Sequence, residues 1–295
     1  MKKNCISFLG LALGLAVIAM TVAGAPVWGQ LAGKTAVKPL AADFAQFMSV
    51  VTASDWQGSG RFFIMMQRVF AQLFIGVPVL MLVLFIVHYL LVGPKSFAHD
   101  GEKVFYYSVF CRVVHTLAAI SFTVLVLSGL LIILGRIFHG GELVRTARYL
   151  HAPAALVFAP AFLVLFLLWV RDMLPAACDL DWLLVLGGYL SRKKTVVVAG
   201  KFNLGQKFWF WLAVGGGLVM AYTGYCLFTF SGTLPALRLA AVVHNLLGVL
   251  LLVMFMIHLY MALFAIRGSL RSMLTGYKNA DEVAQMHSEY WRRIS

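Results

Sequence analysis

Eight histidines have the clearest capacity for redox or proton chemistry, because several of them fall inside long apolar segments. An ionisable side chain is costly to bury in hydrocarbon, so a histidine in such a segment indicates function by default. Four of them occupy matched depths. Because successive segments would cross a membrane in opposite directions, His115 at the start of 113–135 and His258 near the end of 241–266 lie toward the same side. His151, just before 152–170, and His244, near the start of 241–266, lie toward the other side. These four histidines therefore divide into two pairs, one for each leaflet of a membrane.

The apolar segment 241–266 carries one histidine of each pair. His244 and His258 are fourteen residues apart, which in an α-helix returns to within about 40° of the same face and separates them by about 21 Å. Two stacked haems, each with two axial histidines, require this spacing, because one helix then gives a ligand to each haem. Neutral imidazole is a suitable ligand for haem iron. Spacing and depth therefore predict that the four histidines bind two b-type haems.

The remaining histidines fit other roles. His88 has no partner at matching depth, and we interpret it as a hydrogen-bonding residue or a proton relay. His99, His139 and His287 fall in connections or in the tail and are predicted to be surface residues, with proton exchange as an alternative for the first two. Six glycines in the apolar segments leave small surfaces that a flat macrocycle or another helix could approach. They are Gly129, Gly215, Gly216, Gly217, Gly224 and Gly248.

The four cysteines do not form a metal-binding motif. They are widely spaced, at Cys5, Cys111, Cys178 and Cys226. This spacing excludes a CxxC zinc site and a cysteine-ligated iron–sulfur cluster. Any redox cofactor must therefore be held by other ligands.

The composition places the apolar segments in a membrane. Of 295 residues, 62% are hydrophobic and 12% are charged, with a mean hydropathy of +0.90. A soluble domain has about 25% charged residues, so a water-soluble globular protein is excluded. Lys and Arg outnumber Asp and Glu by 24 to 11. In a membrane protein this excess usually lies in cytoplasmic loops, so we expect membrane lipid and no nucleic acid as a partner.

The segment lengths predict an all-α integral membrane protein. An α-helix needs about 20 apolar residues to cross the hydrocarbon core. Five apolar segments are about this long or longer: 69–93, 113–135, 152–170, 208–230 and 241–266. They lack the alternation of barrel strands, so a helical bundle is expected. A basic head, an apolar run and small residues indicate a signal peptide or an N-terminal anchor over 1–25. Residues 26–68 are more polar and are predicted to form an exported segment.

Basic residues in the connections predict the orientation. Fourteen Lys and Arg lie after the first, third and fifth apolar segments, against four in the other two connections. By the positive-inside rule the first group, with the C-terminus, is cytoplasmic. An exported N-terminus followed by five spans gives the same topology. We therefore expect a multi-pass protein of a bacterial inner membrane.

Five blocks of residues follow one another in order between about 110 and 275. They are Arg112-Val113-Val114-His115, Arg148-Tyr149-Leu150-His151, Lys201-Phe202-Asn203-Leu204-Gly205-Gln206-Lys207, His244-Asn245-Leu246-Leu247-Gly248, and the sequence from His258 to Ser269. In this order and spacing they resemble the gamma subunit of respiratory formate dehydrogenase, of the cytochrome b556 type. The resemblance implies a four-helix di-haem cytochrome b domain over 110–275, followed by a cytoplasmic tail over 276–295. The extra helix at 69–93 and the segments before it depart from the short form of that family.

The resemblance also implies which residues bind which group. The haem on the periplasmic side would take His151 and His244, and the haem on the cytoplasmic side would take His115 and His258. A quinone, menaquinone or ubiquinone, would bind beside the cytoplasmic haem at Asn203, Gly205 and Gln206. Asn203 is equally suited to be the N-cap of the next helix. Arg112 and Arg148 are interpreted either as contacts to haem propionates or as interfacial residues.

The implied function is that of a non-catalytic electron-transfer subunit, on which formate itself is not oxidised. Its partners would be a molybdenum or tungsten catalytic alpha subunit and an iron–sulfur beta subunit, with quinone as the electron acceptor. The residues alone leave alternatives open. These are the cytochrome b subunit of a nickel–iron hydrogenase or of another molybdoenzyme, a haem-free transporter with a proton relay, and a haem-free scaffold.

Overall fold

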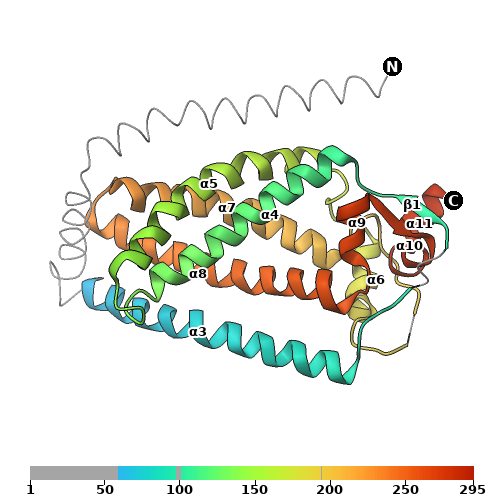
Figure 1. Cartoon of the computed structure of the whole chain (residues 1–295), viewed down its shortest axis with the longest axis horizontal. Coiled ribbons are helices and arrows are strands. Elements are labelled where there is room, and N and C mark those ends of the chain that lie inside the picture. Colours follow the sequence, from blue (N-terminus) through green and yellow to red (C-terminus); the bar gives the residue numbers. More distant parts are fainter. Residues whose placement is uncertain (1–58, 98–100, 194) are drawn as a thin grey trace, which may run out of the picture. The chain divides into compact units, whose positions relative to one another are not determined.

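The computed structural model describes residues 59–97, 101–193 and 195–295. The predicted signal peptide or anchor of 1–25, most of the predicted exported segment of 26–68, and His99 lie outside these residues. Element numbering in the described part therefore begins at α3 (Figure 1).

Five helices of the described residues are long and apolar enough to cross a membrane. They are α3 (Ser59–Leu91), α4 (Val109–Ile133), α5 (Gly141–Trp169), α7 (Leu204–Thr229) and α8 (Leu234–Tyr260), the last continued by one π-helical turn, η2 (Met261–Ala265). Each contains most of one predicted apolar segment. The prediction of an all-α multi-pass membrane protein is confirmed.

The helices begin earlier than the apolar segments that predicted them. The largest differences are at α3, α5 and α8, which begin at Ser59, Gly141 and Leu234. A polar residue such as Arg145 ends an apolar run, but arginine is a good helix former, so the backbone stays helical through it. His151 and His244 are consequently each the eleventh residue of their helices.

The described residues fall into two compact units, and every long helix contributes to both. Of the described residues, unit 1 comprises those from Ser59 to Phe74 with Leu117–Val164 and Leu218–Gly248. In it, Asn245 Nδ2 of α8 donates to Gln67 Oε1 of α3 at 3.0 Å. Unit 1 therefore contains a polar contact between the extra helix and the helix that carries two of the predicted ligands.

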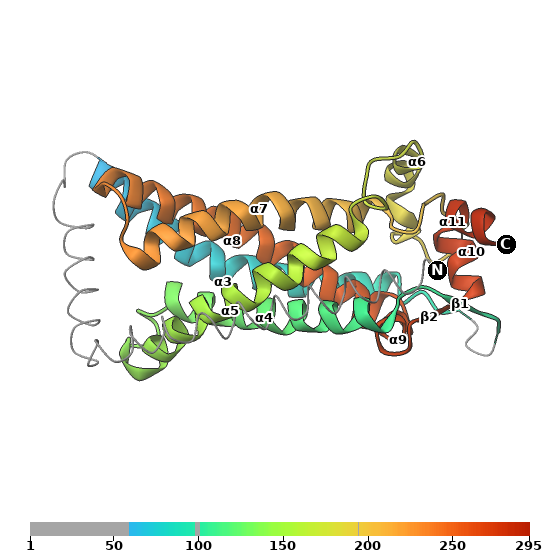
Figure 2. The same ribbon diagram turned by 90° about the horizontal axis from the view of Figure 1, so that it is seen from above.

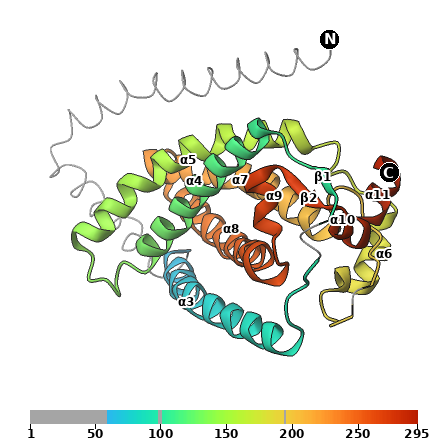
Figure 3. The ribbon, with the colours of Figure 1, turned by 45° about the vertical axis from the view of Figure 1, so that its right-hand side comes forward.

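Unit 2 comprises Ile75–Thr116, Leu165–Gly217 and Val249–Ser295, and it adds short elements to the helix ends. β1 (Lys103–Phe105) pairs antiparallel with β2 (Tyr277–Asn279). α9 (Ser269–Thr275) precedes β2 (Figure 3), while α10 (Ala280–Met286) and α11 (Ser288–Ile294) follow it, and α10 lies beside β1 (Figure 2). α6 (Cys178–Val185) and the 3-10 turn η1 (Leu186–Gly188) stand between α5 and α7 in the sequence.

We call β1, β2, α10 and α11 the C-terminal layer. Lys278 and Glu282 form an ion pair of 2.7 Å within it, with side chains 8% and 4% exposed. Met286 at the end of α10 forms a buried apolar cluster with Phe97 and Val197, which lie outside the layer. The residues predicted as a tail, 276–295, are therefore a folded part of unit 2.

Candidate functional site

The structure brings the four histidines together in the predicted pairs. In unit 1 the ring centroids of His151 on α5 and His244 on α8 are 6.4 Å apart, with 59° between the ring planes. In unit 2 those of His115 on α4 and His258 on α8 are 6.3 Å apart, with 55° between the planes. We call these the first and the second histidine pair.

The separation within each pair fits one metal ion held between two imidazoles. A metal–imidazole bond of about 2 Å on each side, added to about 1 Å from each ring centre to its nitrogen, gives centroids about 6 Å apart. Across the described ranges, no three His, Cys, Asp or Glu side chains gather as a metal site. Two imidazoles therefore suit an ion that brings its other ligands with it, as haem iron does.

A serine hydroxyl fixes the tautomer of His151. Ser128 Oγ on α4 lies 2.8 Å from His151 Nδ1 and donates a hydrogen bond to the Val124 carbonyl at 2.6 Å. Because a carbonyl oxygen only accepts, the hydroxyl proton is used in that bond, and the Nδ1–H of His151 donates to Ser128. The lone pair of the ring is then on Nε2, which is left to bind a metal.

A threonine hydroxyl does the same for His244. Thr223 Oγ1 on α7 lies 2.9 Å from His244 Nδ1 and donates to the Val219 carbonyl at 2.7 Å. Both members of the first pair therefore present Nε2. Sequence reasoning missed these two hydroxyls. The sequence pattern that could have indicated them is a hydroxyl residue followed by a glycine inside an apolar segment. It occurs at Ser128-Gly129 and at Thr223-Gly224, which we call the hydroxyl–glycine doublets.

Two of the predicted glycine surfaces lie against the first pair. A Cβ built on Gly129 would be 3.4 Å from His151 Cε1, and one built on Gly224 would be 3.3 Å from His244 Cε1. Each ring of the first pair is therefore positioned by a hydroxyl at Nδ1 and by a glycine beside Cε1. Other predicted surfaces meet a phenylalanine ring of α3 or open space: Gly248, Gly215 and Gly217.

The second pair has aromatic neighbours in place of hydroxyls. Trp209 stacks on His258, with ring centroids 6.1 Å apart and 23° between the planes. Trp169 lies against His115, with centroids 6.2 Å apart. Indole carries a donor and no acceptor, so these rings pack against the imidazoles without taking a hydrogen bond from them.

Comparison with known proteins gives the family. Residues 106–276, more than half of the chain, match the prokaryotic cytochrome b561 family. The chain belongs to the prokaryotic cytochrome b561 family. It is thus a b-type cytochrome of the membrane, a class that carries electrons on haem. This membership argues against the haem-free transporter and the haem-free scaffold, and it leaves α3 outside the matched region.

Relatives of this cytochrome include subunits of formate dehydrogenases. The chain is 28% identical over 152 residues to the nitrate-inducible formate dehydrogenase cytochrome b556(Fdn) subunit of Escherichia coli (strain K12), covering 50% of this chain and 70% of the relative. It is 28% identical over 151 residues to the formate dehydrogenase cytochrome b556 subunit of Haemophilus influenzae, covering 50% and 63%. The cytochrome b556(fdo) subunit of the same Escherichia coli strain is 25% identical over 152 residues, covering 50% and 71%. These similarities are distant and partial.

The predicted quinone residues of this cytochrome form the start of α7. Asn203 Oδ1 accepts the Gln206 N–H at 3.0 Å, and Gln206 Oε1 accepts the Asn203 N–H at 3.0 Å. This reciprocal pair is a capping box, so the predicted N-cap role of Asn203 is confirmed. Both side-chain oxygens are used there, and the side chain of Asn203 is also hydrogen-bonded to Tyr189. A hydrogen bond to a quinone carbonyl would therefore come from the remaining amide hydrogens of Asn203 and Gln206.

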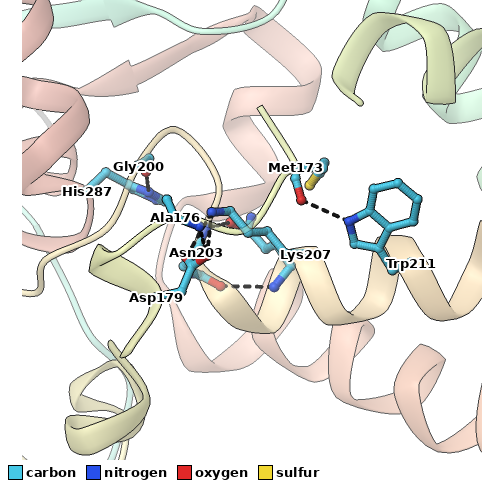
Figure 4. Close-up of polar contacts among 9 residues, drawn as sticks. Met173, Ala176, Asp179, Gly200, Asn203, Lys207, Trp211 and His287 are labelled. Carbon is cyan, nitrogen blue, oxygen red and sulfur yellow. Dashed lines mark hydrogen bonds and ion pairs between the residues drawn. The ribbon is translucent and has the colours of Figure 1, made fainter. Parts of the chain in front are cut away.

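Two neighbours of this helix start were not predicted. The Trp182 ring of α6 lies against Gly205, with Cη2 at 3.3 Å from a Cβ built there, and its buried Nε1 has no hydrogen-bond partner in the described part of the chain. Trp182 thus adds an indole donor beside the predicted quinone residues. Lys207 forms a buried ion pair with Asp179 (Figure 4).

The two arginines predicted to contact haem propionates each stand three residues before a pair histidine. Arg112 on α4 precedes His115, and its Nη1 donates to the Leu274 carbonyl at the end of α9. Arg148 on α5 precedes His151 and is half-buried. One helical turn separates each arginine from its histidine. Their contact with propionates stays a prediction.

His88 is a hydrogen-bonding residue, as predicted. Its Nε2 lies 2.9 Å from the Tyr189 carbonyl and its Nδ1 lies 2.6 Å from the Tyr260 hydroxyl. Because the carbonyl only accepts, Nε2–H donates to it, and Nδ1 of the neutral ring accepts from the tyrosine. Both nitrogens are therefore engaged by protein groups.

The surface prediction is right for His139, which is exposed, and wrong for His287. His287 is 3% exposed, and its Nδ1 donates to the Gly200 carbonyl at 2.8 Å (Figure 4). Burial, with Lys278 nearby, lowers the pKa of His287 from 6.5 to about 3. The error arises because residues 276–295 fold into the C-terminal layer, a tertiary arrangement that local polarity does not reveal.

Proposed function

We propose that this chain is the membrane-anchor and electron-transfer subunit of a formate dehydrogenase complex. It would carry electrons from an iron–sulfur subunit to membrane quinone by way of two b-type haems, and formate would be oxidised on a separate molybdenum or tungsten subunit. The geometry of the two histidine pairs, at 6.4 and 6.3 Å, carries the haem part of the proposal. The formate part is supported by three relatives that are named formate dehydrogenase cytochrome b556 subunits.

In this proposal each pair holds one haem by its imidazole nitrogens. His151 and His244 would hold the haem toward the periplasm, and His115 and His258 the haem toward the cytoplasm. Haem iron supplies reversible one-electron chemistry when bound. α8 spaces the two sites, because fourteen residues of helix between His244 and His258 rise by about 21 Å. The residues of the chain thus set the distance over which an electron crosses the membrane.

The quinone would bind at the start of α7, beside the cytoplasmic haem. The amide nitrogens of Asn203 and Gln206 and the indole nitrogen of Trp182 supply neutral donors for its carbonyl, and Gly205 leaves room for close approach. Reduction to the quinol takes two electrons and two protons. With the C-terminus in the cytoplasm, these protons would be drawn from that side.

The first test is a reduced-minus-oxidised spectrum with a pyridine haemochrome assay on the purified chain. We expect two b haems per chain, and loss of at least one in each of the variants His115→Ala, His151→Ala, His244→Ala and His258→Ala. The control is His139→Asn, because this exposed residue has a φ of +56° that asparagine tolerates. A well-folded parent chain without haem would overturn the cytochrome assignment of these sites.

A second test separates the formate dehydrogenase from a nickel–iron hydrogenase. Membranes that contain the whole complex are given formate or hydrogen, and haem reduction is followed by the α-band. Reduction by formate, with quinol formed at the same rate, supports the proposal. Reduction by hydrogen alone would assign the chain to a hydrogenase.

A further inference from the structure

The hydroxyl–glycine doublets of unit 1 make the same contacts with the two rings of the first histidine pair. Ser128-Gly129 on α4 lies against His151 of α5, and Thr223-Gly224 on α7 lies against His244 of α8. The two doublets come from different helices and use different hydroxyl residues. Nevertheless, the distances agree, with 2.8 and 2.9 Å to Nδ1 and 3.4 and 3.3 Å from the glycine Cβ position to Cε1. Both rings are therefore held by the same combination of contacts.

Both hydroxyls accept a hydrogen bond from an imidazole N–H, since each donates its own O–H to the carbonyl four residues earlier in its helix. A hydrogen bond from Nδ1–H makes the imidazole a stronger donor to a metal at Nε2. A stronger donor stabilises ferric more than ferrous iron, which lowers the reduction potential. Two such bonds would act on one iron, because the centroids of the two rings are 6.4 Å apart, a separation that fits one metal ion between them.

The imidazoles of the second pair have no hydroxyl hydrogen-bonded to Nδ1 among their described contacts. Its imidazoles are flanked by Trp169 and Trp209, whose indoles carry no acceptor for Nδ1–H. The two sites therefore differ in how strongly their imidazoles donate to iron.

We propose that Ser128 and Thr223 are positioning residues that hold His151 and His244 in the Nδ1–H tautomer and set the haem of the first pair at a lower reduction potential than the haem of the second. This rests on the proposed haem function. The lower potential lies on the side where electrons enter in that proposal. Passage to the second site is then energetically downhill.

The test is a potentiometric titration of the purified chain, followed by the optical α-bands and by the low-spin ferric signals in electron paramagnetic resonance. In Ser128→Ala and Thr223→Val, we expect one of the two haem components to move to a more positive potential, while the other stays in place. The double variant moves further than either single one. Ser128→Thr and Thr223→Ser keep the hydroxyl and keep the potential of the parent.

The chain offers matched controls on α4. Ser121 is buried like Ser128 and donates to the carbonyls of Leu117 and Ala118, and Thr123 donates to the carbonyl of Ala119. Neither hydroxyl is hydrogen-bonded to a histidine of the described residues. Ser121→Ala and Thr123→Val should therefore leave both components unchanged.

The outcomes are distinct. A parent chain without haem contradicts the proposed function, whatever the hydroxyls do. A parent with two haems, whose Ser128→Ala and Thr223→Val variants titrate as the parent does, overturns this inference and leaves the function standing. Loss of one haem in the alanine or valine variants, with both haems kept in Ser128→Thr and Thr223→Ser, supports the positioning role.

Discussion

Asp179 receives the ammonium of Lys207 through both of its carboxylate oxygens, each 2.8 Å from Nζ. The side chains are 8% and 6% exposed. Asp179 also accepts the Ala176 N–H at 2.7 Å. The last residue of the block 201–207 therefore ties the start of α7 to α6 and has a structural role.

Breaking this ion pair should destabilise the protein strongly. Lys207→Met leaves a buried carboxylate without its cation, which costs about 3–5 kcal/mol. We expect a clear fall in the midpoint of thermal unfolding in detergent, measured by circular dichroism, and partial recovery in the double variant with Asp179→Asn. Glu142→Gln is the control, because its ion pair with Arg145 is exposed and worth at most about 1 kcal/mol. Equal melting of Lys207→Met and the parent would show that the pair does not stabilise the fold.

The two roles of Asn203 can be separated by substitution. Asn203→Ser keeps an oxygen that caps α7 and removes the amide donor, whereas Asn203→Ala removes both, at about 1 kcal/mol of stability. If the amide nitrogen binds quinone, both variants slow quinol formation by membranes, and the alanine variant, which also loses the cap, melts earlier than the serine variant. Normal quinol formation in Asn203→Ser would remove Asn203 from the quinone site and leave its cap in place.

A methyl group beside His244 should disturb the first pair alone. Gly224→Ala places a Cβ 3.3 Å from the imidazole, and such overpacking costs about 1–3 kcal/mol. We expect lower occupancy, or an altered low-spin signal, for one of the two haems. Gly76→Ala on α3, which was not predicted to face a haem, meets nothing within 4 Å among the described residues and should keep both haems. An identical spectrum in the two variants would show that the ring has room to move.

His287 should make stability depend on pH. Its folded pKa of about 3 lies below its usual 6.5, so below pH 6.5 the unfolded chain binds a proton that the folded chain does not. This stability is present above pH 6.5 and is lost as the pH falls toward 3, by about 2 kcal/mol between pH 7 and pH 5. His287→Asn keeps a donor for the Gly200 carbonyl and should flatten that part of the pH profile of thermal unfolding. His139→Asn should not change it.

Helix position and the histidine pairs could be predicted from the sequence, because both follow from local periodicity. Fourteen residues between His244 and His258 fix a common face of α8, whatever else the chain does. The partners, His151 and His115, follow from matching depth in the membrane. Helix starts were less predictable, since residues such as Arg145 are polar and helical at once.

The contacts that position the rings could not be predicted in this way. Ser128 meets His151, and Lys207 meets Asp179, across 23 and 28 residues of sequence. Such pairs depend on how helices rotate against one another, and a serine in an apolar segment has the same local pattern whether it meets a histidine or, like Ser121, only its own helix. Burial of His287 depends likewise on the C-terminal layer.

α3 covers part of the surface of α8 near His244 and near His258, the two pair histidines of that helix. In unit 1, Gln67 binds Asn245, the neighbour of His244. In unit 2, Phe85 stacks on Tyr260, two residues after His258, with ring centroids 4.4 Å apart. A companion subunit therefore cannot dock on this strip of α8 without displacing α3. Deleting α3 would open the strip to lipid or to a second protein, and the shielding of α8 is thus supplied by the chain itself.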